Sequence, residues 1–280
     1  MGFLKKDKIG IVFSGGGGKG AYEAGVWQAL REKKLDRNIT GVAGTSIGGL
    51  TAILFAMDDF ASAINLWEEA KIQDKNMPSF LSNSITKNVA KRVSNKLTPE
   101  EMYSAFDNWF RSKFLRSKKL EQLIKSQVDN DILRKSQRVC FVTCHDLVRK
   151  EVVYYNVSKM ENSDDIYKVV QATASIPFIF HPIKLDNRRL VDGGISDNTP
   201  IKPLYDAGFT KIIVVKLKKE DDKYAELFPN AKISVLNPSQ ELGGFLDGSL
   251  NFYASSIDEK WSQGYLDMLT FIKENRKMFK

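Results

Sequence analysis

Three short stretches of this 280-residue chain hold residue types that could do chemistry. Residues 15–20 have the sequence GGGGKG, residues 44–48 have GTSIG, and residues 192–194 have DGG. Glycines let backbone N–H groups approach an anion closely. A serine between glycines can be an exposed nucleophile, and a carboxylate can accept its proton. Together the three stretches indicate nucleophilic chemistry at a centre that develops negative charge.

The glycine run is ambiguous when it is considered alone. It satisfies G-x-G-x-x-G, a pattern that binds pyrophosphate in dinucleotide-binding folds, but it is not a P-loop because its lysine is followed by Gly20. One alternative is therefore a dinucleotide-binding module, with Gly15–Gly20 on the pyrophosphate and Asp36 on the ribose. That alternative gives no role to Ser46 or Asp192. In addition, Asp36 precedes a predicted strand, whereas the ribose ligand should follow one.

Ser46 lies between a predicted strand, residues 39–45, and a predicted helix, residues 47–57. A tight strand-to-helix turn exposes a serine, and glycines two positions before and after it avoid steric clashes. The alternative is that the serine hydroxyl only caps the helix. The glycine run on the preceding predicted strand–helix junction favours a nucleophile.

A serine nucleophile is usually paired with a histidine base, and histidine is scarce in this chain. The two histidines are His145 and His181, and neither follows Asp192, so the Ser–acid–His order of α/β-hydrolases does not fit Asp192 as the acid. A triad of Ser46, Asp146 and His181 is formally open. We interpret His181 instead as a packed neighbour of the site and His145 as a strand end.

Short apolar runs alternate with helical patterns, which predicts an α/β fold whose mostly parallel sheet is covered on both faces. The uncharged run 38–57 begins with Gly, Thr and Ser, so we interpret it as strand, turn and helix and not as a membrane span. No repeat or linker is visible, and we expect one domain over residues 1–280. The expected strands are 8–14, 39–45, 138–145, 151–157, 189–192, 211–217 and 233–236, and the expected helices are 22–34, 47–57, 60–71, 164–175 and 250–279.

Composition and charge narrow the class of protein. Hydrophobic residues make up 42% and charged residues 27% of the chain. This composition is typical of globular proteins. The net charge of +8 favours an acidic partner, either nucleic acid or an anionic lipid surface, without choosing between them. Cys140 and Cys144 are about 13 Å apart along a predicted strand, too far for a disulfide. With no apolar signal segment in residues 1–8, we expect a cytoplasmic protein.

Residues 79–119 differ from the rest and are predicted to form an inserted, basic helical cap. Within them, residues 84–119 hold nine Lys or Arg against three Asp or Glu. Four aliphatic residues recur at every fourth position, from Ile85 to Leu97, among basic residues. This pattern predicts a narrow apolar stripe on a basic helix. The helix could be a solvated surface helix, or it could bring the protein into peripheral contact with an anionic membrane.

The three motifs in this order resemble those of the patatin-like phospholipases, whose pattern is G-G-G-x-[KR]-G, G-x-S-x-G and D-G-[GA]. Further likeness lies in ATASIPFIFHPI at 172–183, DGGISDNTP at 192–200 and GYLDML at 264–269. The resemblance spans about residues 8–272 and is weakest over 79–119. It implies a three-layer α/β sandwich with a mostly parallel central sheet and an inserted helical cap.

The resemblance also implies a mechanism, a Ser–Asp dyad that works without histidine. Ser46 would be the nucleophile and Asp192 its base, and Lys19 occupies the basic position of the first motif with no role assigned. The oxyanion hole would consist of backbone N–H groups of four consecutive residues: Gly15, Gly16, Gly17 and Gly18.

The implied reaction is hydrolysis of carboxylic esters of phospholipids or lysophospholipids through an acyl-enzyme intermediate. It implies a lipid substrate, no metal or other cofactor, and no nucleic acid partner. A non-catalytic lipid-binding protein on the same fold is a second alternative. Such proteins usually lose a motif residue, and none is missing here.

Overall fold

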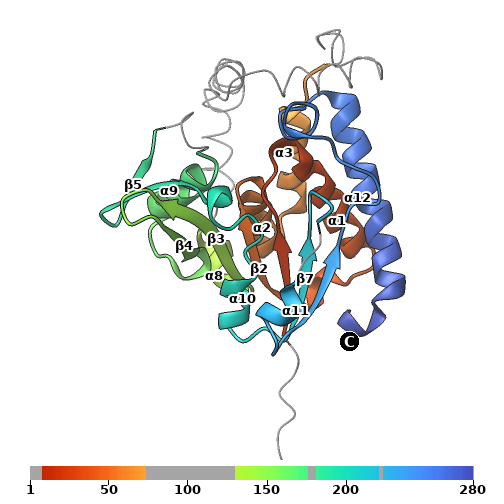
Figure 1. Cartoon of the computed structure of the whole chain (residues 1–280), viewed down its shortest axis with the longest axis horizontal. Helices are drawn as coiled ribbons and strands as arrows, with labels where there is room; N and C mark the ends of the chain where they lie inside the picture. The colour runs from red at the N-terminus through yellow and green to blue at the C-terminus, as the bar shows by residue number, and fades with distance from the viewer. Residues whose placement is uncertain (1–7, 74–129, 176–180, 221–222, 280) are drawn as a thin grey trace, which may run out of the picture.

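The computed structural model describes residues 8–73, 130–175, 181–220 and 223–279 (Figure 1). Eight described strands form one sheet in the order β5-β6-β3-β2-β1-β7-β8, with β4 also paired to β3. Strands β1, β2, β3, β7 and β8 are parallel, whereas β4, β5 and β6 run antiparallel to their neighbours. Their bounds are β1 Ile9–Phe13, β2 Ile39–Thr45, β3 Val139–Asp146, β4 Glu151–Asn156, β5 Ile183–Leu185, β6 Arg188–Asp192, β7 Lys211–Val215 and β8 Lys232–Leu236.

Helices cover both faces of this sheet, which confirms the expected three-layer α/β sandwich. One face packs against α1 and α2, and the long α12 runs along α1 (Figure 1). A second apolar cluster on the other face joins β1 and β7 to residues of α10 and α11. The described α-helices are α1 Ala21–Glu32, α2 Ile47–Met57, α3 Phe60–Ala70, α8 Asn130–Lys135, α9 Ser163–Thr173, α10 Lys202–Asp206, α11 Tyr224–Leu227 and α12 Ala254–Glu274.

The apolar runs of the sequence form buried elements at the centre of the molecule, with other elements packed around them. Every residue of β1 is buried, as expected for a central strand of a sheet covered on both faces. In α2 every residue from Gly48 to Met57 is buried, so the uncharged run 38–57 is a strand, a turn and a core helix, as predicted. Within the described part of the chain, no helix has the length and apolar character needed to cross a bilayer.

The expected elements are found with small shifts of their ends. The predicted closing helix 250–279 is α12 followed by a separate 3₁₀ turn at Arg276–Phe279. The short elements β5, α8, α10 and α11 were not predicted. Both cysteines lie buried and free on β3. The predicted cap 79–119 and its basic stretch 84–119 lie outside the described residues.

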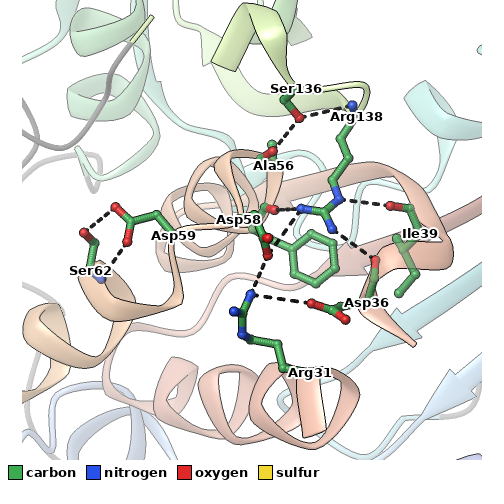
Figure 2. A network of polar contacts seen from close by, with 10 residues as sticks. Arg31, Asp36, Ile39, Ala56, Asp58, Asp59, Ser62, Ser136 and Arg138 are labelled. Atoms are coloured by element: carbon green, nitrogen blue, oxygen red, sulfur yellow. Dashed lines mark hydrogen bonds and ion pairs between the residues drawn. The ribbon is translucent and has the colours of Figure 1, made fainter. Parts of the chain in front are cut away.

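Arg138 ties the start of β3 to the preceding part of the sheet (Figure 2). Its guanidinium donates to three backbone carbonyls, those of Ile39 (3.1 Å), Phe55 (2.7 Å) and Asp36 (3.2 Å). It also lies 4.9 Å from the centre of the Phe55 ring. Nearby, Arg31 pairs with Asp36 at 3.5 Å and with Asp58. The network joins the start of β2, the end of α2 and the start of β3.

Replacing Arg138 should destabilise the fold. In Arg138→Met the stem still packs, but three carbonyls lose their donor, and we expect the free energy of unfolding to fall by about 3 kcal/mol. Arg138→Lys has one nitrogen for three acceptors, so its free energy of unfolding should lie between those of Arg138→Met and the wild type. Urea denaturation followed by circular dichroism measures both, with exposed Lys135→Met as the control. A loss no larger than that of the control would contradict the role given to Arg138.

Candidate active site

The glycine run and Ser46 lie side by side because β1 and β2 are parallel neighbours. Phe13 pairs with Gly44, so the residues that follow each strand emerge together at one edge of the sheet. A Cβ placed on Gly15 would lie 3.2 Å from Cβ of Ser46 and 3.3 Å from the Thr45 carbonyl oxygen. This carboxyl edge is where α/β folds form their sites.

Ser46 occupies a sharp strand-to-helix turn with a left-handed φ of 56° and ψ of −127°. Positive φ is uncommon for a residue with a side chain, and such strained conformations are found at active sites as well as in turns. The serine does not cap α2 with its side chain, so the helix-cap alternative does not describe its hydroxyl.

Two glycines and a threonine hold the turn of Ser46 in place. A Cβ on Gly44 would lie 2.0 Å from the Gly48 carbonyl oxygen, and one on Gly48 would lie 2.4 Å from that of Phe13, so only glycine fits at either position. The Ser46 N–H donates to Thr173 Oγ1 at 2.8 Å, and this hydroxyl donates to the Thr143 carbonyl at 2.7 Å. The turn is therefore fastened to both β3 and α9.

Asp192 reaches Ser46 because β6 continues the sheet where β2 ends. Thr45 is opposite Thr143 on β3, and Asp192 is opposite the next residue, Cys144. Since β4 pairs with the other edge of β3, β6 and β2 lie on the same side. The carboxylate is thereby placed directly beyond the end of β2, where the Ser46 hydroxyl lies close enough to interact with it and lower its pKa.

The Asp192 carboxylate is almost completely buried, with 6% of the residue exposed. Burial raises its pKa to about 6, although a hydrogen bond from the Gly194 N–H and the interaction with the Ser46 hydroxyl oppose the shift. The Gly194 N–H lies 2.8 Å from Oδ1, and the backbone N–H of Asp192 donates to the Ser175 carbonyl at 2.8 Å. A carboxylate held in this way can accept a proton near neutral pH.

The glycine run forms a tight loop against the segment that follows Asp192. The Gly15 N–H donates to the Asn198 carbonyl at 3.1 Å, and Asn198 Nδ2 donates back to the Gly15 carbonyl at 3.0 Å. Gly17 has a φ of 56° and begins a 3₁₀ turn, Gly17–Gly20. The first N–H groups of such a turn have no acceptor within it, so those of Gly17 and Gly18 could serve as anion donors.

A second loop, residues 248–251, closes around this turn. A Cβ on Gly17 would lie 2.3 Å from the Ser249 carbonyl oxygen, and one on Gly18 would lie 2.6 Å from that of Asn251. Buried Lys260 of α12 holds the loop by donating to the carbonyls of Gly248 (3.2 Å) and Asn251 (3.3 Å). Sequence reasoning missed this lysine, although a cation on the buried stripe of a helix was a usable signal.

Lys19 of the glycine motif is buried, and burial lowers the pKa of its ammonium group. Its side chain runs along the same loop, because a Cβ on Gly248 would lie 2.5 Å from Cε of Lys19. Asp247 opposes the shift in pKa by its charge. Lys19 therefore packs behind the turn of glycines.

Glu23 is a fully buried carboxyl group behind the site. It interacts with the Ser14 N–H at the end of β1, and its Oε2 lies 3.2 Å from the Thr51 hydroxyl. That hydroxyl also donates to the Ile47 carbonyl at 3.1 Å. A hydroxyl has a single proton, so a protonated Glu23 can donate to Thr51 while Thr51 donates to Ile47. Burial raises the pKa of Glu23 well above its usual value, which favours this neutral form.

The formally open triad is not assembled in the described residues. Asp146 accepts the Val148 N–H at 3.0 Å and pairs with Arg188 at 3.3 Å. His145 is opposite Val191 within the sheet, and His181 is exposed. In the described chain, neither imidazole hydrogen-bonds to Ser46.

The fold also bears on the dinucleotide-binding alternative and on metal binding. Asp36 precedes β2 and belongs to the network of Arg138, at the sheet edge opposite the glycine loop, so it cannot hold the ribose of a nucleotide bound at Gly15–Gly20 (Figure 2). Among the residues that the structure describes, no three or more His, Cys, Asp or Glu side chains are grouped so that they could hold a metal ion.

Comparisons with known proteins agree with this architecture. Lysophospholipase NTE1 of Meyerozyma guilliermondii is 24% identical over 220 residues, which cover 79% of this chain and 13% of that protein. An uncharacterized NTE family protein of Mycobacterium tuberculosis is 24% identical over 82% of this chain and 55% of its own length. The chain thus spans only part of the length of each of these two relatives.

Among solved structures, VipD from Legionella pneumophila shares the fold. It aligns with a TM-score of 0.56 and 17% identity over 96% of this chain and 67% of its own. The model of one family, described as patatin-like phospholipase, matches residues 11–205. That match covers more than half of the chain and includes the glycine run, Ser46 and Asp192, and on this ground the chain belongs to the patatin-like phospholipase family.

Proposed function

We propose that this protein is a serine acyl hydrolase that cleaves carboxylic esters of phospholipids or lysophospholipids. The observation that carries the proposal is the position of Ser46 beside a buried carboxylate, Asp192, at the meeting ends of β2 and β6, with the pKa of that carboxylate raised to about 6. Membership of the patatin-like phospholipase family supports a lipid ester as substrate, and the similar protein named lysophospholipase supports a lysophospholipid.

In the proposed first half-reaction, Ser46 Oγ attacks the ester carbonyl carbon while Asp192 takes the hydroxyl proton. The carbonyl oxygen becomes an oxyanion, and the tetrahedral intermediate collapses as its C–O bond to the alcohol breaks. Asp192 gives the proton to the departing alcohol, leaving an acyl-serine ester. In the second half, water attacks that ester, Asp192 takes a proton from the water, and Ser46 regains it as the fatty acid leaves.

The oxyanion donors are assigned to the backbone N–H groups of Gly16, Gly17 and Gly18. Gly17 and Gly18 start the 3₁₀ turn, so its partial positive end faces the site. The Gly15 N–H is already bonded to Asn198, and we assign Gly15 to fixing the loop beside Ser46 and not to donating. Each donor of such a hole typically contributes about 10² to 10³ in rate.

The non-catalytic alternative is a lipid-binding protein on the same fold. A serine with a strained backbone beside a buried carboxylate of raised pKa has no purpose in simple binding, and this arrangement favours the enzyme. Turnover by purified protein decides between the two.

The dyad is tested by replacing its members. Ser46→Ala should lose turnover of lysophosphatidylcholine and labelling by a fluorophosphonate, and Asp192→Asn should lose at least about 100-fold in kcat because a general base contributes that much. Exposed Ser239→Ala is the matched control and should retain full turnover. Turnover by folded Ser46→Ala at the wild-type rate would exclude Ser46 as the nucleophile.

The pH dependence tests the base. Asp192 works in its ionised form, so with a pKa of about 6 the kcat/KM for a soluble ester should be constant above that pH. Below it, kcat/KM should fall about tenfold per pH unit. Far-UV circular dichroism at each pH separates this loss from unfolding. A profile that stays flat down to pH 4.5 would show that the catalytic group is not a carboxylate with a raised pKa.

Glu23 is tested through stability. Because its pKa is raised in the folded state, its contribution is most favourable below pH 4.5 and declines as pH rises toward the folded pKa. Glu23→Gln keeps the shape of the neutral acid but does not titrate. As the pH rises over that range, the free energy of unfolding of the variant should therefore increase relative to that of the wild type by up to about 1.4 kcal/mol per pH unit. Urea denaturation at several pH values measures the difference, and parallel curves for the two proteins would show that Glu23 is ionised.

A further inference from the structure

Two neighbouring hairpin turns form a surface that the proposed reaction does not use. One is the turn Leu147–Lys150 between β3 and β4, and the other is the end of the β5–β6 hairpin, residues 184–189. The Leu147 N–H donates to the Arg189 carbonyl at 2.9 Å, which joins the two. We call this surface the hairpin tip; β5 marks its position at the left of the sheet in Figure 1.

The hairpin tip lies at the same edge of the sheet as the candidate active site. Strand β3 is parallel to β1 and β2, so its last residue, Asp146, and the turn that follows lie at their carboxyl edge. β6 has Asp192 at the Ser46 end and Arg188 at its other end. Four residues of strand span only about 13 Å. A surface that contacts the tip therefore faces the edge that carries the dyad.

Two aliphatic side chains project from the tip into solvent. Val148 is 63% exposed and Leu147 is 39% exposed, and they are adjacent in a turn between two strands. Single exposed apolar residues need no explanation, but two together at the end of a hairpin, with cations beside them, form an amphipathic surface.

The cations of the tip are only partly neutralised. An open depression is lined by four basic residues, Lys168, Lys184, Arg188 and Arg189, and by two carboxylates, Asp165 and Asp186. Lys168 pairs with Asp165 at 2.8 Å, and Arg188 pairs with Glu151 at 2.6 Å. Lys184, Arg189 and nearby Lys150 have no ion pair with the described residues.

Lys184 and Arg189 are also directly opposite each other on β5 and β6. Like charges in this position oppose strand pairing, and an external anion would relieve the repulsion. Lys211 and Lys232 form a similar pair on β7 and β8 at the opposite edge of the sheet, so a like-charge pair by itself identifies no site. The pair on the tip differs because exposed aliphatic residues lie next to it on the active-site edge.

We propose that the hairpin tip docks the protein on an anionic lipid bilayer. Leu147 and Val148 enter the interface, while Lys150, Lys184 and Arg189 contact lipid phosphates and carboxylates. A nucleic acid would satisfy the cations but would leave the aliphatic residues without a partner, which favours the bilayer. The choice of a lipid surface rests on the proposed lipid hydrolase function. It assigns docking to described residues, independently of residues 84–119.

The test measures vesicle binding in the inactive Ser46→Ala protein, so that turnover does not enter the result. Binding to phosphatidylcholine vesicles with and without phosphatidylserine is followed by cosedimentation. Lys184→Glu with Arg189→Glu should weaken binding to the anionic vesicles by at least about 20-fold, since each cation near such a surface contributes about fivefold. Val148→Ser should weaken binding severalfold, and added salt should weaken only the charge-dependent part.

Lys211→Glu with Lys232→Glu is the matched control, because it makes the same change of charge on a pair at the opposite edge. It should bind anionic vesicles as the parent does. Hydrolysis of a soluble short-chain ester by tip variants that retain Ser46 should be unchanged, which separates docking from catalysis.

The proposal is overturned if the Lys184 and Arg189 double variant binds anionic vesicles like its parent, or if the control loses as much. It is equally overturned if the double variant loses binding only to a nucleic acid. Failure of the hydrolase proposal has a different signature, since it would remove ester turnover from the wild type without altering vesicle binding by the Ser46→Ala protein.

Discussion

The arrangement depends on one interaction, that of the Ser46 hydroxyl with the buried Asp192 carboxylate. A carboxylate in water is a poor base at neutral pH, because its proton is held too weakly. Burial changes this by penalising the ionised form. The same burial must not go so far that the carboxylate is neutral throughout, and the Gly194 N–H limits the shift. The surrounding structure keeps the Asp192 carboxylate buried and hydrogen-bonded at the same time.

The sheet brings Ser46 and Asp192 together because the same edge of β3 pairs first with β2 and then with β6. Over its first half β3 pairs with β2, and over its last residues it pairs with the antiparallel β6. The end of β2, which is followed by Ser46, and the end of β6, which is Asp192, therefore meet head to head. Two short-range constraints then fix the serine: glycines that allow its turn, and a threonine of α9 that accepts its N–H. Ser46 is thus fixed by its backbone, independently of an imidazole.

Buried polar groups of the described chain support both the candidate active site and the fold around it. Glu23 lies behind the glycine loop, and Lys260 holds the loop that closes around Gly17. Each is costly to bury. Lys260 is satisfied by backbone carbonyls, whereas Glu23 meets the Thr51 hydroxyl through Oε2 and its Oε1 has no hydrogen-bond partner among the described residues. At the opposite edge, Arg138 plays a comparable part for the fold, by joining the start of β3 to β2 and α2. Buried polar groups thus support the candidate active site at one end of the parallel strands and the surrounding fold at the other end.

The class of fold, most of the strands and helices, and the three motifs at their junctions could be predicted from the amino-acid sequence alone. These are local properties: apolar periodicity gives the elements, and glycine spacing marks turns that no other residue can form. The sequence was also sufficient, through resemblance, to single out Ser46 and Asp192. Three features became visible only in the folded chain: β6 turns back antiparallel beyond β2, the Gly15 N–H donates to the Asn198 carbonyl, and Lys260 holds the loop that closes around the glycine turn. Each of these joins residues far apart in the chain or buries a charge, and no local pattern records which distant backbone will satisfy a given donor.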